Sequence, residues 1–222
     1  MVFPEGWPPS APELVAAQES LGRANPERLR PDGRSGVGAV FVCFARGGSG
    51  PGSAGDPAWA AAVFETAKCV VEGSGGAPYE PGLLALREGP LLELAVRGLE
   101  RVPDVLLVDA TGRDHPRRAG LALHLGAVLD LPTVGVTHRP LVATGPWPPD
   151  AEGATAPLHL DGEEVGRWLR TRRGTRPLAV HAAWRTDPAT AVEVITSALS
   201  GRRTPEPLRR ARTLARSARA RA

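Results

Sequence analysis

The stretch VPDVLLVDATGRDHPRRAGLALHLGAVLDLPTVGVT, residues 102–137, decides the fold class of this chain. It contains two short apolar runs, residues 102–110 and 131–137, each of the length of a buried strand. Between them, residues 115–130 have the apolar periodicity of an amphipathic helix, with Pro116 near its first turn. This order of strand, helix and strand predicts an α/β fold.

The sequence before this unit predicts an antiparallel meander followed by a helix. GVGAVFVCFA, residues 36–45, is a continuous apolar run with β-branched and aromatic residues, which is typical of a central strand. Residues 58–72 have room for two short strands that break near residues 65–68. Residues 81–100 then have helical periodicity, with Pro90 as a kink or a new start.

The remaining elements complete one domain. Residues 11–24 have the spacing of an opening helix, and residues 162–171 and 176–184 have the composition of strands. A further helix follows Asp187, which is suited to cap its first turn. We therefore predict a single α/β domain with a mixed sheet of about five main strands, the first three antiparallel, flanked by helices.

The composition is that of a globular protein. Of the 222 residues, 42% are hydrophobic and 23% are charged. No stretch reaches the ~18 consecutive apolar residues of a membrane span, and Cys43 and Cys69 lack the spacing of a zinc site. We expect a cytoplasmic monomer that has no membrane partner.

Basic charge is concentrated at the carboxyl end of the chain. Residues 202–222 hold eight arginines and one acidic residue, Glu206, although the net charge of the whole chain is only +3. We therefore separate a domain of residues 1–201 from an Arg-rich tail of residues 202–222. The spacing of the tail arginines predicts a helix with one basic face, which either binds nucleic acid or is simply solvated.

Two acidic residues are candidates for chemistry. Asp109 ends a wholly apolar strand, and ligands of open α/β sheets bind at the carboxyl ends of strands, although Asp also caps turns. Glu88 lies within a helical segment, where an isolated Glu is usually a solvated charge. Two or three carboxylates converging on one divalent cation would make a phosphodiesterase site, and the spacing alone does not show that these two converge.

Three stretches together resemble the endonuclease V family. They are PYEPGLLALREGP (78–90), PDVLLVDATGRDHPRRAGLALHLGAVLDLPTVGV (103–136) and RTPEPLRRA (203–211). Members of that family are nucleases of ribonuclease H-like fold that cleave nucleic acid near deaminated adenine. The resemblance extends over roughly residues 11–215 and implies the same fold here.

The resemblance also assigns roles to individual residues. It places Glu88 and Asp109 at two of the carboxylates of a Mg²⁺ or Mn²⁺ site. It places Tyr79, Pro81 and Gly82 at the wedge that enters the nucleic acid beside the lesion, where an aromatic ring replaces stacking lost when a base is extruded. His115 and Arg117 match the HPRR motif of the family, so we expect them to bind substrate.

Other positions depart from the family pattern, and they are positions where the family has metal-binding or active-site residues. Phe41 stands where the first strand of the family carries a metal-binding aspartate, and His138 replaces a lysine with a group that is largely neutral at pH 7. Trp184 replaces a site histidine, while Asp114 and His181 add polar groups nearby. We expect any metal site to be weak or lost.

These departures leave different functions open. A cleft rebuilt as an enzyme for a nucleotide-like or other small substrate would use Glu88, Asp109 and His138 as catalytic residues, with Phe41 and Trp184 as an aromatic wall. The alternative is a non-catalytic binder of DNA or RNA that contains inosine, and conventional nuclease activity is a third reading. An enzyme would hold His138 within hydrogen-bond reach of an acid or a ligand.

Overall fold

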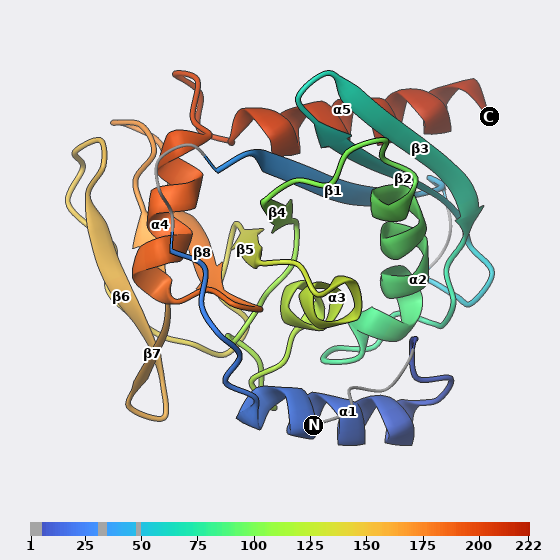
Figure 1. Ribbon diagram of the computed structural model, residues 1–222, viewed down its shortest axis with the longest axis horizontal. Helices are drawn as coiled ribbons and strands as arrows, with labels where there is room; N and C mark the ends of the chain where they lie inside the picture. The colour runs from blue at the N-terminus through green and yellow to red at the C-terminus, as the bar shows by residue number, and fades with distance from the viewer. Residues whose placement is uncertain (1–5, 31–34, 48–49) are drawn as a thin grey trace.

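A single mixed sheet organises the part of the chain that the computed structural model describes, residues 6–30, 35–47 and 50–222 (Figure 1). Its strand order is β3-β2-β1-β4-β5-β8-β7-β6. The strands are β1 (Val37–Phe44), β2 (Pro57–Phe64), β3 (Ala67–Ser74), β4 (Val105–Val108), β5 (Thr133–Thr137), β6 (Thr155–Leu160), β7 (Glu163–Leu169) and β8 (Leu178–Ala182). The helices are α1 (Ala11–Arg23), α2 (Leu84–Arg97), α3 (Leu121–Leu129), α4 (Pro188–Ser197) and α5 (Glu206–Arg221).

The strand directions confirm the predicted topology and enlarge the sheet. Strands β1, β2 and β3 are antiparallel, as expected, while β4 and β5 run parallel to β1. The other strands, β8, β7 and β6, add antiparallel pairs beyond β5, so the sheet has eight strands rather than about five. The carboxyl ends of β4 and β5 therefore lie side by side in the middle of the sheet.

Two helices differ from the sequence prediction. Helix α3 begins at Leu121, whereas we expected it to start near His115. The intervening HPRR segment is irregular, and Arg118 has a positive φ of 58°, which a helix cannot contain. Helix α2 is continuous through Pro90, whose ring is exposed. The HPRR side chains are thus presented from a loop at the sheet edge.

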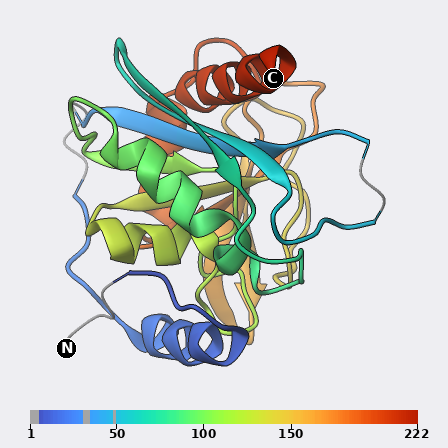
Figure 2. The same cartoon turned by 90° about the vertical axis from the view of Figure 1, so that its right-hand side faces the viewer.

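Helices cover both faces of the sheet (Figure 2). Alternate residues of the strands point to opposite faces, so Ala39 of β1 packs with α4 and α5 while Val40 packs with α2 and α3. Helix α1 lies outside α2 and α3 and completes that layer. Within the described residues, no helix is long and apolar enough to cross a membrane.

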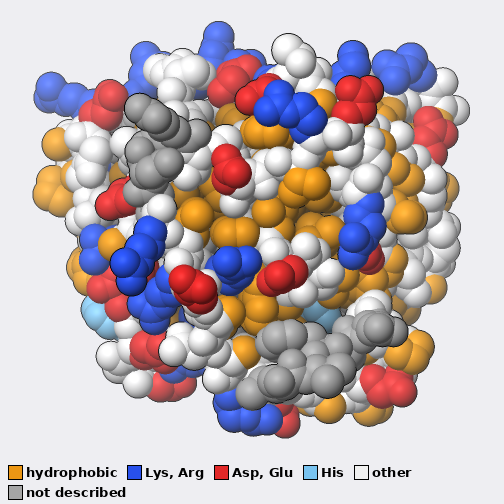
Figure 3. Space-filling view, in the orientation of Figure 1, with side chains coloured by type: hydrophobic (Ala, Val, Ile, Leu, Met, Phe, Trp, Pro, Cys, Tyr) orange, Lys and Arg blue, Asp and Glu red, His pale blue; other side chains and the backbone are white. Residues whose placement is uncertain are grey.

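The Arg-rich segment forms α5 and packs on β1 and β2. Its buried side chains are small or apolar: Leu208, Ala211, Ala215 and Ala218. The arginines lie on the remaining faces, and blue side chains recur along the upper margin of the molecule, over α5 (Figure 3). The segment that we set apart from residue 202 onward is therefore packed against the sheet over residues 206–221.

Candidate functional site

The two acidic residues singled out in the sequence come together at the carboxyl end of β4. Asp109 directly follows this strand, and Glu88 reaches it from α2. Both line one cavity of ≈ 190 Å³, and Phe41 of β1 lines it too. The strand and the helix thus bring together the carboxylate pair that the resemblance implied.

Glu88 has an unusual ionisation. Burial, together with the smaller effect of the neighbouring Asp109 charge, raises the pKa of Glu88 to about 8. At neutral pH the Glu88 carboxyl is therefore mostly protonated. A protonated carboxyl donates a hydrogen bond and is a poor ligand for a cation.

Asp109 is held by an arginine of the last helix. Arg212 donates from Nη2 to Oδ1 at 2.9 Å and from Nε to Oδ2 at 3.2 Å. The Arg212 side chain is 14% exposed and that of Asp109 26%, so the pair is largely removed from water. Arg212 and Arg216 also lie 5.7 and 5.4 Å from the centre of the Phe41 ring.

The sequence analysis missed the role of Arg212. Its spacing with Arg209, Arg216 and Arg219 indicated only a basic helix face. Nothing in that pattern shows which arginine meets an acid more than one hundred residues earlier, because the pairing depends on how α5 crosses β1. The position of a charged side chain along a uniform Arg/Ala helix is set by tertiary packing alone.

The residues at this site do not fit a divalent cation. Mg²⁺ prefers several ionised oxygen ligands, whereas here both carboxylate oxygens of Asp109 are bound by a guanidinium and Phe41 has no ligand atom. Within residues 6–30, 35–47 and 50–222, no group of three His, Cys, Asp or Glu side chains is arranged to hold a metal.

His138 does not contact the acids. Its Nδ1 lies 3.1 Å from Nη1 of Arg203, and no hydrogen bond joins its described side chain to Glu88 or Asp109. Burial lowers the pKa of His138, and the nearby Arg203 and Arg212 lower it further. The imidazole is therefore neutral and turned toward an arginine, which is not the acid–base arrangement that we expected of a catalytic residue.

Trp184 and the two added polar residues have structural positions. Trp184 is 2% exposed and packs in the core beside Gly126 and Thr133, so its expected place in the cleft wall is wrong. Asp114 is buried and accepts the backbone N–H groups of Leu141, Val142 and Ala143. His181 contacts both Asp114 and Thr137, so this buried network fixes the loop after β5.

The predicted wedge lies on the other side of Asp109. Tyr79 is 44% exposed, and with Pro81, Gly82, His115 and Asp109 it lines a second cavity of ≈ 180 Å³. The carbonyl oxygen of Gly82 accepts from Nη2 of Arg117 at 3.0 Å and lies 3.1 Å from Nε2 of His115.

His115 and Arg117 of the HPRR motif therefore hold the backbone of the wedge at Gly82. Burial lowers the pKa of His115 to about 4, so its ring is neutral at pH 7. The ring contacts the Gly82 carbonyl and helps to fix its position. Gln18 of α1 adds a third donor to the Gly82 carbonyl and also accepts from Nε of Arg117. No sequence pattern marks Gln18 as part of this support, because it lies in an ordinary amphipathic helix.

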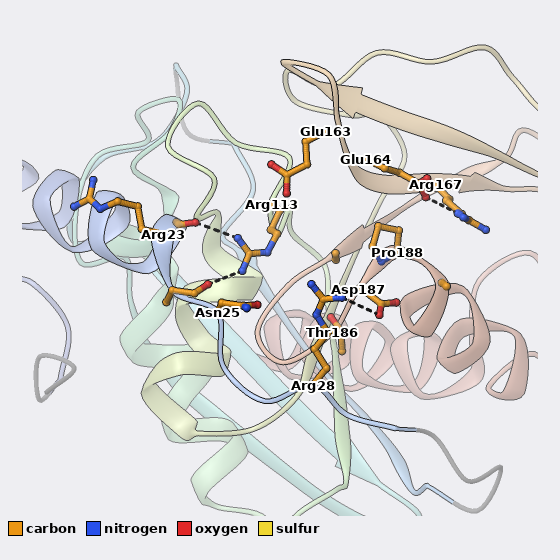
Figure 4. Close-up of a pocket in the computed structure, with 14 residues that line it drawn as sticks. Arg23, Asn25, Arg28, Arg113, Glu163, Glu164, Arg167, Thr186, Asp187 and Pro188 are labelled. Atoms are coloured by element: carbon orange, nitrogen blue, oxygen red, sulfur yellow. Dashed lines mark hydrogen bonds and ion pairs between the residues drawn. The ribbon is translucent and has the colours of Figure 1, made fainter. Parts of the chain in front are cut away.

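A separate, charged cavity of ≈ 520 Å³ lies between the end of α1, hairpin β6–β7 and the start of α4 (Figure 4). Several of its charged side chains bind one another or the backbone. Arg113 donates to the carbonyls of Gly22 and Ala24, and Arg167 pairs with Glu164. We assign no function to this cavity.

The sheet order, with an acidic pair at the carboxyl end of its central strand, defines a ribonuclease H-like protein. The sequence profile of the Endonuclease V family matches residues 59–213. An endonuclease V from Roseiflexus sp. is 37% identical over 220 residues, which cover 96% of this chain and 95% of the relative. The chain belongs to the endonuclease V family.

Solved structures agree with this assignment. The crystal structure of endonuclease V from Streptomyces avermitilis is similar at a TM-score of 0.86 and 35% identity, over 99% of this chain and 98% of that chain. Endonuclease V from Ciona intestinalis, in complex with a 23mer DNA containing an inosine followed by a ribo-adenosine, shares the fold. Its TM-score is 0.71 and its identity 20%, over 95% of this chain and 97% of that chain.

Proposed function

We propose that this protein binds inosine-containing nucleic acid without a divalent cation and without efficient cleavage. The observation that carries the proposal is the pairing of Arg212 with both carboxylate oxygens of Asp109, beside Phe41. The site keeps the features that would recognise an extruded base and lacks those that would activate water. It is the binder that the sequence analysis left as the alternative to a rebuilt enzyme.

Recognition rests on the wedge and the cavity beside it. Tyr79 projects an aromatic ring that is free to fill the gap left by an extruded base. The cavity next to it is lined by Leu121, Leu141 and the strand-end residues Ala110 and Thr111. A largely apolar pocket suits the flat ring of an extruded base such as the inosine in the DNA bound by the Ciona intestinalis relative.

The residues around Asp109 support slow hydrolysis of the phosphodiester bond. Hydrolysis needs a cation or fixed donors where negative charge develops, and removing one such contact commonly costs about 10² or more in rate. Here the positive charge of Arg212 is neutralised by Asp109, and the family lysine is replaced by a neutral His138. Slow cleavage follows from these two changes together.

A rebuilt enzyme for a small nucleotide is less well supported. That hypothesis requires a hydrogen bond between His138 and an acid and a place for Trp184 in the cleft wall, whereas Nδ1 of His138 faces Arg203 and Trp184 is buried in the core. Phe41 alone of the expected aromatic wall faces Asp109. A thermal-shift titration tests the enzyme hypothesis, which requires free inosine monophosphate to raise the Tm; an unchanged Tm would rule it out.

Fluorescence anisotropy in EDTA tests the proposal. We expect wild type to bind a strand with one inosine more tightly than the same strand with adenine. Tyr79→Ala should lose most of this preference, whereas Leu94→Ala, which removes an exposed side chain of α2, should keep it. Equal affinity of wild type for both strands would refute the proposed function.

A further inference from the structure

An exposed tryptophan stands on the loop between β5 and β6. The Trp147 side chain is 53% exposed, although large aromatic side chains usually bury most of their surface. Its ring meets the buried Trp168 edge-on, with centroids 6.2 Å apart, and the guanidinium of Arg176 lies 5.5 Å from its centre. An aromatic ring flanked by an arginine is the usual platform for a stacked base.

The loop that carries Trp147 is held in place by buried polar contacts. Arg170, which is itself buried, donates from Nη2 to the carbonyl of Pro148 at 3.1 Å and from Nε to that of Pro149 at 2.9 Å. Trp168 donates from Nε1 to the carbonyl of Gly145. These bonds fix the residues on both sides of Trp147, so the ring is presented by a defined loop.

The surroundings of this ring are strongly basic. Three loops meet there, residues 138–152, 170–177 and 200–205, and together they contain seven arginines and two acidic residues. Arg203 joins them, because it donates to the carbonyls of Arg176 and Pro177 and lies beside His138. The excess of positive charge matches a phosphate backbone.

The basic loops share the sheet edge with the cleft. Strand β8 is antiparallel to β5, with Ala179 opposite Thr137, so the loop before β8 lies at the carboxyl end of β5. Asp109 ends the neighbouring strand β4, where Val108 pairs with Gly135. Arg212 binds Asp109 at this edge, and Arg203, which lies beside His138, donates to the carbonyl of Arg176 next to the Trp147 ring.

We propose that Trp147 and Arg176 form a second subsite, which binds a nucleotide of the same strand on one side of the recognised base. The flanking base stacks on the Trp147 ring, and Arg176 and Arg203 bind the phosphates that lead to it. The subsite tolerates any sequence, because each base offers a similar face for stacking. It rests on the proposed function, since it extends the strand that occupies the cleft.

Three single-stranded DNAs labelled with fluorescein test the subsite by anisotropy in EDTA. One is a 5-mer centred on inosine, and two are 15-mers with inosine near the 5′ or the 3′ end. We expect wild type to bind one 15-mer more tightly than the 5-mer. Trp147→Ala should weaken the binding of that 15-mer by roughly 5- to 30-fold and leave the affinity for the 5-mer unchanged.

Two controls separate stacking from charge and from misfolding. Trp147→Phe keeps an aromatic face and should restore most of the lost affinity, and a 15-mer with an abasic flank should bind wild type and Trp147→Ala equally. Arg176→Ala should lower the slope of log affinity against log salt by about 0.7.

The possible failures are distinct. Equal affinity of wild type and Trp147→Ala for both 15-mers, or an equal loss on the 5-mer, would overturn the subsite. If the wild type instead bound inosine and adenine strands with equal affinity, the proposed function would be overturned.

Discussion

Arg212 of the last helix binds both carboxylate oxygens of Asp109, with N–O distances of 2.9 and 3.2 Å. Asp109 ends the central strand β4, whereas Arg212 comes from a helix whose sequence looks like a basic tail. The contact joins the last helix to the central strand and neutralises the Asp109 carboxylate at the carboxyl edge of the sheet.

This pair should contribute to stability. A double-mutant cycle with Asp109→Asn and Arg212→Ala should give a coupling free energy of about 1–3 kcal/mol, because charge-assisted bidentate bonds in a largely buried site exceed surface pairs. Urea denaturation measures the four unfolding free energies. Additive effects of the two substitutions would show that the contact is not formed in solution.

Metal binding should depend on Arg212 and Phe41. The wild type should bind Mn²⁺ weakly in a titration followed by electron paramagnetic resonance, since Asp109 is occupied by a guanidinium. Phe41→Asp combined with Arg212→Ala should strengthen binding by at least about tenfold, as expected when a third ligand is added and Asp109 is released.

A matched control uses the neighbouring arginine. Phe41→Asp combined with Arg216→Ala removes the other cation near Phe41 and leaves the Arg212–Asp109 pair intact. It should bind Mn²⁺ more weakly than the variant without Arg212. Tight binding of Mn²⁺ by wild type would contradict our assignment of this site.

Asp114 should be essential to the loop that follows β5. Asp114→Ala leaves the backbone N–H groups of residues 141–143 without their acceptor, which should cost roughly 3 kcal/mol or more of unfolding free energy. Hydrogen exchange of these amides should accelerate. Asp161→Asn, at an exposed turn, should change neither quantity, and unaltered exchange in Asp114→Ala would disprove the anchoring role.

His124 should make the protein less stable in acid. Burial lowers the pKa of His124 from 6.5 to about 4, so between these values the unfolded state binds a proton that the folded state does not. Stability should therefore fall as the pH decreases from 6.5 to 4, by up to about 1.4 kcal/mol per pH unit from this residue. His124→Phe, which preserves stacking on Trp7, should remove that part of the slope in denaturation measured across this range.

The sequence predicted the elements of the fold better than the details of the site. Apolar runs such as residues 36–45 and 131–137 define strands by themselves, and the residues that the family resemblance singled out, Glu88, Asp109 and Tyr79, line two neighbouring cavities. Trp184 was misplaced because a substitution at a former site position can turn a side chain into the core.

The pairing of Arg212 and the contact of His138 with Arg203 could not be predicted. Both depend on where α5 and the loop before it cross the sheet, and local sequence does not specify that crossing. The same holds for Asp114, whose burial follows from a loop that folds back over it.

Cleavage of inosine-containing DNA tests the central claim most directly. The rate should be measured with Mg²⁺ and with Mn²⁺ under single-turnover conditions, beside the Streptomyces avermitilis endonuclease V at equal concentrations. We expect this protein to bind the DNA and to cleave it at least about 100-fold more slowly, as the loss of a transition-state contact predicts. Cleavage at a rate equal to that of the relative would contradict a site built for recognition alone.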